Sequence, residues 1–171
     1  MRVLVVGDSP EVLCVGGLLA SDSNDVVFAP VEKPLNSGFN LKAAGVEHCF
    51  DALNLYKDSA TAGLFDLVLF GESGDTLELQ RNIIRPALAH DAVVIPLPSS
   101  EQCDEILCHI VGELFVVRSN AEISVSIDEK GNYILSDSPR MRLEEREESD
   151  SWRLDFISTA LTSAGIDTSV A

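Results

Sequence analysis

The fold is decided by the first dozen residues, which read RVLVVGDSPEV from Arg2 to Val12. The residues before Gly7 form a short, continuous apolar run, which is typical of a strand buried on both faces of a parallel sheet. After the glycine, Ser9 can cap a helix and Pro10 suits its first position. The stretch therefore predicts a buried strand, a glycine turn and a helix that continues to about Ser21.

The same alternation of strand and helix continues to residue 112. We expect further buried strands at 25–29, 65–70 and 91–97, and short strands within Val46–Leu55. We expect helices from about Ser37 to Gly45, over a turn at 57–63, from Asp75 or Thr76 to Leu88, and at 101–111. Strands that alternate with helices indicate a parallel sheet with right-handed crossovers.

The pattern changes after Gly112. We expect a strand at 114–117, then a hairpin of strands 121–127 and 133–135, a helix within 142–164 and a closing strand at 166–170. The prediction is thus one α/β domain over residues 1–171. Residues 1–112 form a Rossmann-like, mainly parallel sheet flanked by helices, and residues 113–171 add an antiparallel hairpin, a helix and a strand.

Charge excludes several classes of partner. The chain has 12 Lys plus Arg against 28 Asp plus Glu, a net charge of −16. Such a field opposes nucleic acid, anionic lipid and polyphosphate ligands. The one basic cluster, Arg140, Arg142 and Arg146, alternates with glutamates and is interpreted as a solvated helix face. Since no apolar run reaches the ~18–20 residues that cross a bilayer, we expect a cytoplasmic protein without a membrane partner.

The cysteines and histidines do not indicate a metal site. Cys103 and Cys108 are the only close cysteine pair, and their spacing does not place both sulfurs on one helix face. The four cysteines are interpreted as small buried apolar residues in a reducing compartment. The three histidines lie outside any recognisable catalytic pattern.

Three segments carry a resemblance to a known family. They read FDLVLFGESG (residues 65–74), DAVVIPLPSS (91–100) and LTSAGIDTSV (161–170). The chain resembles the N-terminal NADP-binding domain of ketopantoate reductase (2-dehydropantoate 2-reductase), in which the matching segments typically read FDLVLVAVKA, DTVVLPLQNG and LLRAAGIDVEVS. The resemblance covers essentially the whole chain and implies a Rossmann fold, with NADP(H) as the family's cofactor.

Most of the family's site residues are changed here. The G-x-G-x-x-G fingerprint falls on residues 7–12, where only the first glycine is retained. Asp8 and Glu11 place carboxylates where the diphosphate would lie, and we interpret both as helix-terminal acids. By the resemblance, the vestigial cofactor-binding positions are Gly7, Asp8, Ser9, Pro10, Ser73 and Ser99.

The family's basic residues are also replaced. The residue that pairs with the 2′-phosphate of NADPH falls near Val31, with Lys33 as a possible substitute. The family's lysine falls on Ser73, and its asparagine on Ser99. The helical domain that carries the general-acid lysine would begin after Ala171, so the resemblance implies no catalytic residue in this chain.

Three hypotheses follow. The first is a degenerate, non-catalytic module that binds a second copy or a protein partner on the face of the missing helical domain. The alternative is an NADP(H)-binding half of an oxidoreductase that is completed in trans. A receiver domain using Asp8 and Asp66 is a third reading, although Pro98, Ser99 and Ser100 stand where it requires a lysine. If a small molecule binds, we expect it near Glu72, Ser73 and Ser99, where strands end.

Overall fold

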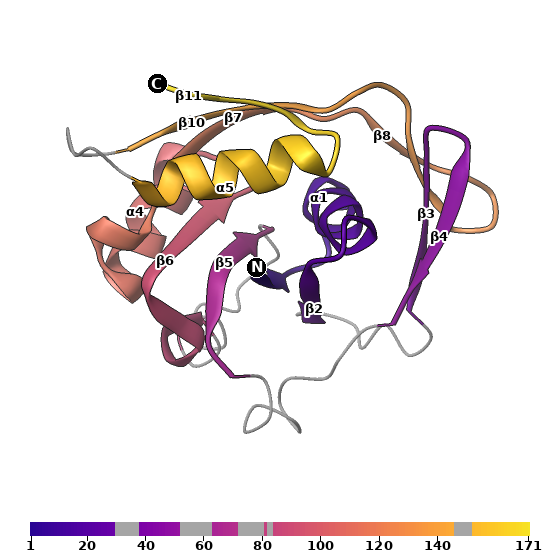
Figure 1. Cartoon of the computed structure of the whole chain (residues 1–171). Coiled ribbons are helices and arrows are strands. Elements are labelled where there is room, and N and C mark those ends of the chain that lie inside the picture. The colour runs from indigo at the N-terminus through magenta and orange to yellow at the C-terminus, as the bar shows by residue number, and fades with distance from the viewer. Residues whose placement is uncertain (30–37, 52–62, 72–80, 82–83, 146–151) are drawn as a thin grey trace.

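The computed structural model describes residues 1–29, 38–51, 63–71, 81, 84–145 and 152–171. Its central sheet has four parallel strands in the order β2-β1-β5-β6 (Figure 1). The strands are β1 (Arg2–Val6), β2 (Asp25–Ala29), β5 (Phe65–Phe70) and β6 (Leu88–Pro96). The expected mainly parallel sheet is therefore confirmed.

Both faces of this sheet are covered, which explains the unbroken apolar runs. Val3 and Val5 belong to a core shared with α1 (Pro10–Ser21) and α5 (Trp152–Ser163). The intervening residues Leu4 and Val6 belong to a second core, shared with α4 (Glu101–Val111). Since alternate residues of a strand point to opposite faces, a strand buried on both sides needs apolar residues throughout.

Helix α4 (Glu101–Val111) matches the sequence prediction residue for residue, and α1 matches it from cap to end. Helix α1 lies between the central sheet and a second sheet (Figure 1). Two adjacent glycines permit this close packing. A Cβ at Gly16 would lie 2.5 Å from Val5 Cγ2, and one at Gly17 would lie 2.7 Å from Leu41 Cδ2.

Two smaller sheets complete the domain. One has the order β4-β3-β9-β8 and the other the order β11-β10-β7. Their strands are β3 (Phe39–Ala43), β4 (Val46–Phe50), β7 (Arg118–Glu122), β8 (Val125–Ile127), β9 (Tyr133–Leu135), β10 (Arg140–Glu144) and β11 (Asp167–Val170). The hairpin β8–β9 is antiparallel as expected, but β9 also pairs with β3, and β10 with β11, in parallel.

The helix expected to end at Gly45 is wrong in the described part of the segment. Residues 39–43 form β3, with alternating buried and half-buried side chains. Ala44 (φ 49°) and Gly45 (φ 80°) then form a two-residue hairpin loop. Positive φ at both loop residues matches the twist of a hairpin, so Gly45 serves as a turn residue and not as a helix cap.

Two strand predictions after Gly112 are also wrong. In place of a strand at 114–117, Glu113–Phe115 form a 3₁₀ turn, and Val116 makes an isolated parallel bridge with Val94. The strand expected at 121–127 is divided between β7 and β8, which belong to different sheets. Apolar content alone could not show where the chain moves from one sheet to the other.

The helix expected within 142–164 is confirmed, because α5 spans Trp152–Ser163. Arg140 and Arg142 lie on β10, where the buried residues Met141 and Leu143 alternate with charged ones. The interpretation of the arginines as a helix face is therefore wrong for these two. Arg146 lies outside the described residues, as do the predicted turn at 57–63, apart from Gly63, and most of the helix at 75–88.

Strand β6 begins at Leu88, three residues before the predicted start at Asp91. The closing strand and Gly165, with φ 89°, agree with the prediction. Within the described residues, no helix combines the length and apolar character needed to cross a bilayer.

Candidate functional site

The candidate site lies at the carboxyl edge of the central sheet. There the hydrogen bonding continues one residue beyond the strands: Gly7 N–H donates to Ala29 O (3.1 Å) and Gly71 N–H to Val6 O (2.8 Å). From β1, the chain continues to β2 on one side, while β5 lies on the other. Ligands of open α/β sheets bind at such a switch point.

Gly7 retains the role that a first fingerprint glycine requires. Its φ is +112°, and a Cβ there would lie 2.5 Å from the carbonyl oxygen of Gly71. Because both the backbone angle and the contact exclude a side chain, only glycine fits. The ends of β1 and β5 thus meet backbone to backbone.

Ser9 closes the turn that follows. Its Oγ accepts a hydrogen bond from Val12 N–H (3.3 Å) and donates one to Leu97 O (3.3 Å). The predicted N-cap is therefore confirmed, and the same hydroxyl also joins α1 to the loop after β6. Pro10 has no N–H to offer. Of the first three helical residues, this leaves Glu11 as the remaining N–H donor.

Val12 occupies the position of the third fingerprint glycine and is fully buried. Gly71 provides the space for it: a Cβ at Gly71 would lie 2.8 Å from Val12 Cγ1 and 2.9 Å from Ser9 Oγ. In the family segment quoted above, alanine stands at this position. A larger residue on α1 is thus matched by a smaller one after β5.

The side chains of this turn carry negative charge. Asp8 and Glu11 are both half-buried. Burial, then the carboxylate of Asp8, then Cys14 raise the pKa of the Tyr133 hydroxyl above its ordinary value. Burial and then Glu11 raise the pKa of the Cys14 thiol to about 12, so this cysteine is a protonated core residue at neutral pH.

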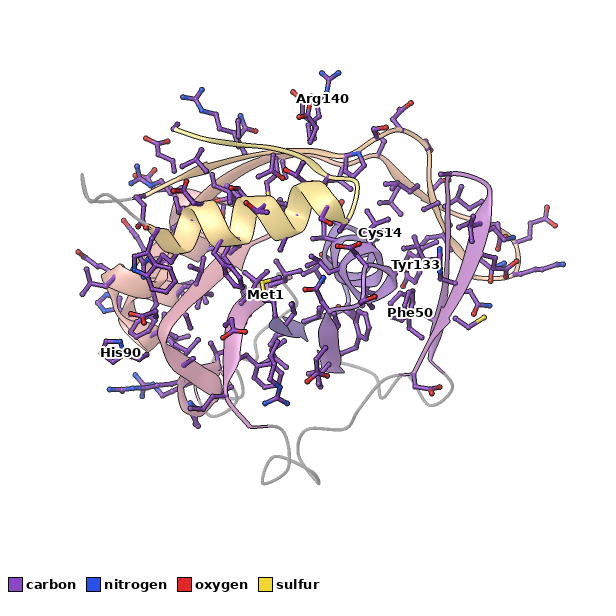
Figure 2. All side chains as sticks on the ribbon, viewed as in Figure 1. Met1, Cys14, Phe50, His90, Tyr133 and Arg140 are labelled. Atoms are coloured by element: carbon purple, nitrogen blue, oxygen red, sulfur yellow. The ribbon has the colours of Figure 1, made fainter. Side chains whose placement is uncertain are left out.

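Tyr133 reaches this region from another sheet. Figure 2 shows Tyr133 and Phe50 between α1 and the β3–β4 hairpin. The ring of Tyr133 packs edge-on against Phe39, with centroids 5.8 Å apart. The sequence did not single out Tyr133, because its position beside α1 depends on the pairing of β9 with β3.

Ser99 lies at the edge of a cavity of about 670 Å³ between the start of α4 and strands β7 and β10. Its Oγ donates to Asp104 Oδ1 (2.9 Å), and Arg118 Nε lies 3.8 Å from Asp104 Oδ2. Asp104 is buried and was not predicted. The available signal was its position in the first turn of α4, shortly after Ser99 and the N-cap Ser100.

Glu101 and Glu105 line the α4 side of this cavity, while Arg142 and Glu144 line its β10 side. The lining thus includes carboxylates and guanidinium groups, without a concentrated positive charge for a phosphate. The other predicted positions, Ser73, Glu72, Val31 and Lys33, lie outside the described residues.

Asp8 and Asp66 do not form a receiver-type pair. Asp8 follows β1 at the carboxyl edge, whereas Asp66 lies near the start of β5 and accepts a hydrogen bond from Arg2 N–H (2.8 Å). The described residues also contain no cluster of three or more potential metal-ligating histidine, cysteine, aspartate or glutamate side chains.

Comparisons by sequence find no matching family model and no matching curated protein. Comparison with solved structures finds 2-dehydropantoate 2-reductases. The enzyme from Geobacter metallireducens has a TM-score of 0.83 at 20% identity, and the matched region covers 100% of this chain and 58% of that one. The enzyme from Porphyromonas gingivalis has a TM-score of 0.79 at 16% identity, covering 100% and 64%.

A ternary structure of D-mandelate dehydrogenase with NADH and anilino(oxo)acetate is also similar, with a TM-score of 0.80 at 16% identity. The match covers 100% of this chain and 57% of that enzyme. The chain thus spans less than two thirds of the length of these relatives. At this identity the likeness establishes the fold, and it confirms the framework that the three sequence segments predicted.

Proposed function

We propose that this chain is a ketopantoate reductase-like Rossmann module that does not bind a dinucleotide and acts instead by binding another protein. One observation carries the proposal, namely the first turn of α1. Pro10 removes one backbone N–H donor from this turn, and the Ser9 hydroxyl occupies the N–H of Val12. The two neighbouring side chains, Asp8 and Glu11, are acidic.

A diphosphate normally binds at such a helix start through free N–H groups and the positive end of the helix dipole. At a separation of about 4–6 Å and an effective dielectric near 20, each half-buried carboxylate would oppose a phosphate charge by roughly 3–4 kcal/mol. Micromolar binding corresponds to only about 8 kcal/mol. Two such repulsions, added to a lost and an occupied N–H, therefore remove most of the affinity expected of the fingerprint.

The second candidate is an NADP(H)-binding half of an oxidoreductase that a separate substrate domain completes. The retained Gly7 favours it, because this residue has the positive φ and the close backbone contact with Gly71 that a first fingerprint glycine requires. The structural similarity to a dehydrogenase solved with NADH also favours it.

Calorimetric titration with NADP⁺, NADPH and NADH distinguishes the two candidates. We expect no saturable binding up to millimolar concentrations for the natural chain. The variant Asp8→Ala/Glu11→Ala should bind more tightly than the natural chain, because both repulsions are removed. Saturation of the natural chain at micromolar NADP(H) would instead support the oxidoreductase half.

The matched control is Glu122→Ala/Glu129→Ala, which removes the same net charge from two exposed positions outside the turn. This control should bind no better than the natural chain. If it binds as well as the Asp8→Ala/Glu11→Ala variant, the general field of the protein excludes the nucleotide, and the turn itself does not.

A further inference from the structure

Helix α5 begins with two exposed aromatic side chains. Trp152, the only tryptophan of the chain, is 63% exposed, and Phe156 is 48% exposed. Residues four apart lie on the same face of a helix. The opposite face, with Leu154, Ile157 and Leu161, packs into the core, so the helix is anchored while its aromatic pair faces outward.

Strand β11 adds a third apolar residue to this end of the helix. Val170, which is 44% exposed, pairs with Leu143 at the end of β10. Two residues further along, Glu145 accepts two hydrogen bonds from Arg153 on α5, at 3.0 and 2.9 Å. This ion pair fixes the start of α5 beside the ends of β10 and β11, as Figure 1 also shows.

The charges around these residues are mainly acidic. Glu145 neutralises Arg153 through the bidentate pair, whose side chains are only 12% and 19% exposed. Asp155 lies between the two aromatic residues in the sequence and is exposed. The whole chain carries −16 charges, which opposes association with a second copy and attracts a basic partner.

We propose that Trp152, Phe156 and Val170 form a docking surface for a segment of another protein that carries apolar side chains flanked by lysine or arginine. This names the partner class of the interaction module and therefore rests on the proposed function. Large exposed aromatic residues are characteristic of the centres of protein interfaces, and the acidic surroundings select the charge of the partner.

The single tryptophan provides a direct test. Three synthetic peptides of equal length serve as probes: one alternates lysine and leucine, one glutamate and leucine, and one lysine and serine. We expect only the lysine–leucine peptide to shift the emission of Trp152 to shorter wavelength in a saturable titration, with an affinity that falls as salt is added. No shift, or equal shifts with all three peptides, would overturn the proposal.

Variants then locate the surface. Phe156→Ser/Val170→Ser should weaken binding of the lysine–leucine peptide roughly tenfold or more. The control Leu114→Ser/Ile127→Ser removes two other exposed apolar side chains and should retain the natural affinity. Equal losses in both variants, or no loss in the first, would contradict the assignment.

A second copy is the competing occupant, and sedimentation velocity over a range of chain concentrations detects it. A dimer whose formation alone shifts the Trp152 emission would overturn the proposal of a basic partner. The nucleotide titrations are independent of this surface. Failure of the peptide test therefore leaves the proposed loss of dinucleotide binding intact, and the reverse also holds.

Discussion

At the scale of single residues, the candidate site depends on which fingerprint positions still carry glycine. Gly7 is retained where only glycine fits, whereas the next fingerprint position is Ser9. The sequence was sufficient to predict that Ser9 caps α1. It could not predict the bond from Ser9 to Leu97 O, because the partner lies 88 residues away and is placed there only by the sheet.

The effect of Asp8 on its surroundings can be measured without any ligand. Its carboxylate opposes a second negative charge on Tyr133 and contributes to the raised pKa of that hydroxyl. We expect Asp8→Asn to lower the Tyr133 pKa towards the ordinary tyrosine value. NMR or ultraviolet titration of the hydroxyl measures this change. Asp22→Asn, at the other end of α1, should leave it unchanged. An unchanged Tyr133 pKa in Asp8→Asn would show that Asp8 exerts no field there.

Asp128 makes the stability of the β8–β9 hairpin dependent on pH. Hydrogen bonds from the side chain and backbone of Asn132, then from Lys42 and the Lys130 N–H, lower its pKa well below the usual range. A carboxyl group with a lowered pKa in the folded state stabilises the fold above its unfolded-state pKa. That contribution is lost as the pH falls below about 4 towards the folded-state pKa.

The variant Asp128→Asn should therefore unfold at lower urea concentration than the natural chain at pH 7. The difference between the two chains should narrow as the pH falls below about 4. Glu129→Gln removes one charge from the neighbouring exposed position and should show no such pH-dependent difference. A constant difference for Asp128→Asn across this range would exclude the carboxylate as its cause.

At the scale of elements, prediction succeeded where one apolar period extended through a whole element. Helix α4 and strand β5 have the predicted bounds because cap, periodicity and end signals agree. It failed at β3, because a glycine such as Gly45 can end a helix or form a hairpin loop, and the residue type does not distinguish the two. It failed again at β10, because the strand's charges resemble those of a solvated helix.

The packing of α1 on the carboxyl edge depends on a matched pair of residues. Gly71→Ala should destabilise the protein by about 1–3 kcal/mol, because the new Cβ overlaps Val12 and Ser9. In a Val12→Gly background, the same change should cost at least about 0.5 kcal/mol less. Urea unfolding of the four chains of this double-mutant cycle measures the coupling. Additive free energies of unfolding would contradict the matched-pair interpretation.

At the scale of the whole molecule, the chain combines a common architecture with an uncommon surface. The framework resembles 2-dehydropantoate 2-reductases, and the match spans this entire chain. The net charge of −16 and the acidic turn oppose the anionic ligand that the framework suggests. The fold alone therefore does not distinguish the interaction module that we propose from a dinucleotide-binding domain.

The candidate site was only partly predictable at this scale. Three of its members, Gly7, Asp8 and Ser9, are adjacent in sequence and follow from the fingerprint. Gly71 and Tyr133 come from β5 and β9, and only the assembled sheets bring them to α1. The sequence thus predicted the negative charge at the turn from Asp8 and Glu11. It did not predict that the charge of Asp8 contributes to the raised pKa of Tyr133.

The most direct measurement of the central claim is a crystal structure of the protein soaked in roughly millimolar NADP⁺. The account predicts no nucleotide density against residues 7–12, with Ser9 still bonded to Leu97 O. A diphosphate bound at the N-terminus of α1, with Ser9 turned away from Leu97, would contradict it.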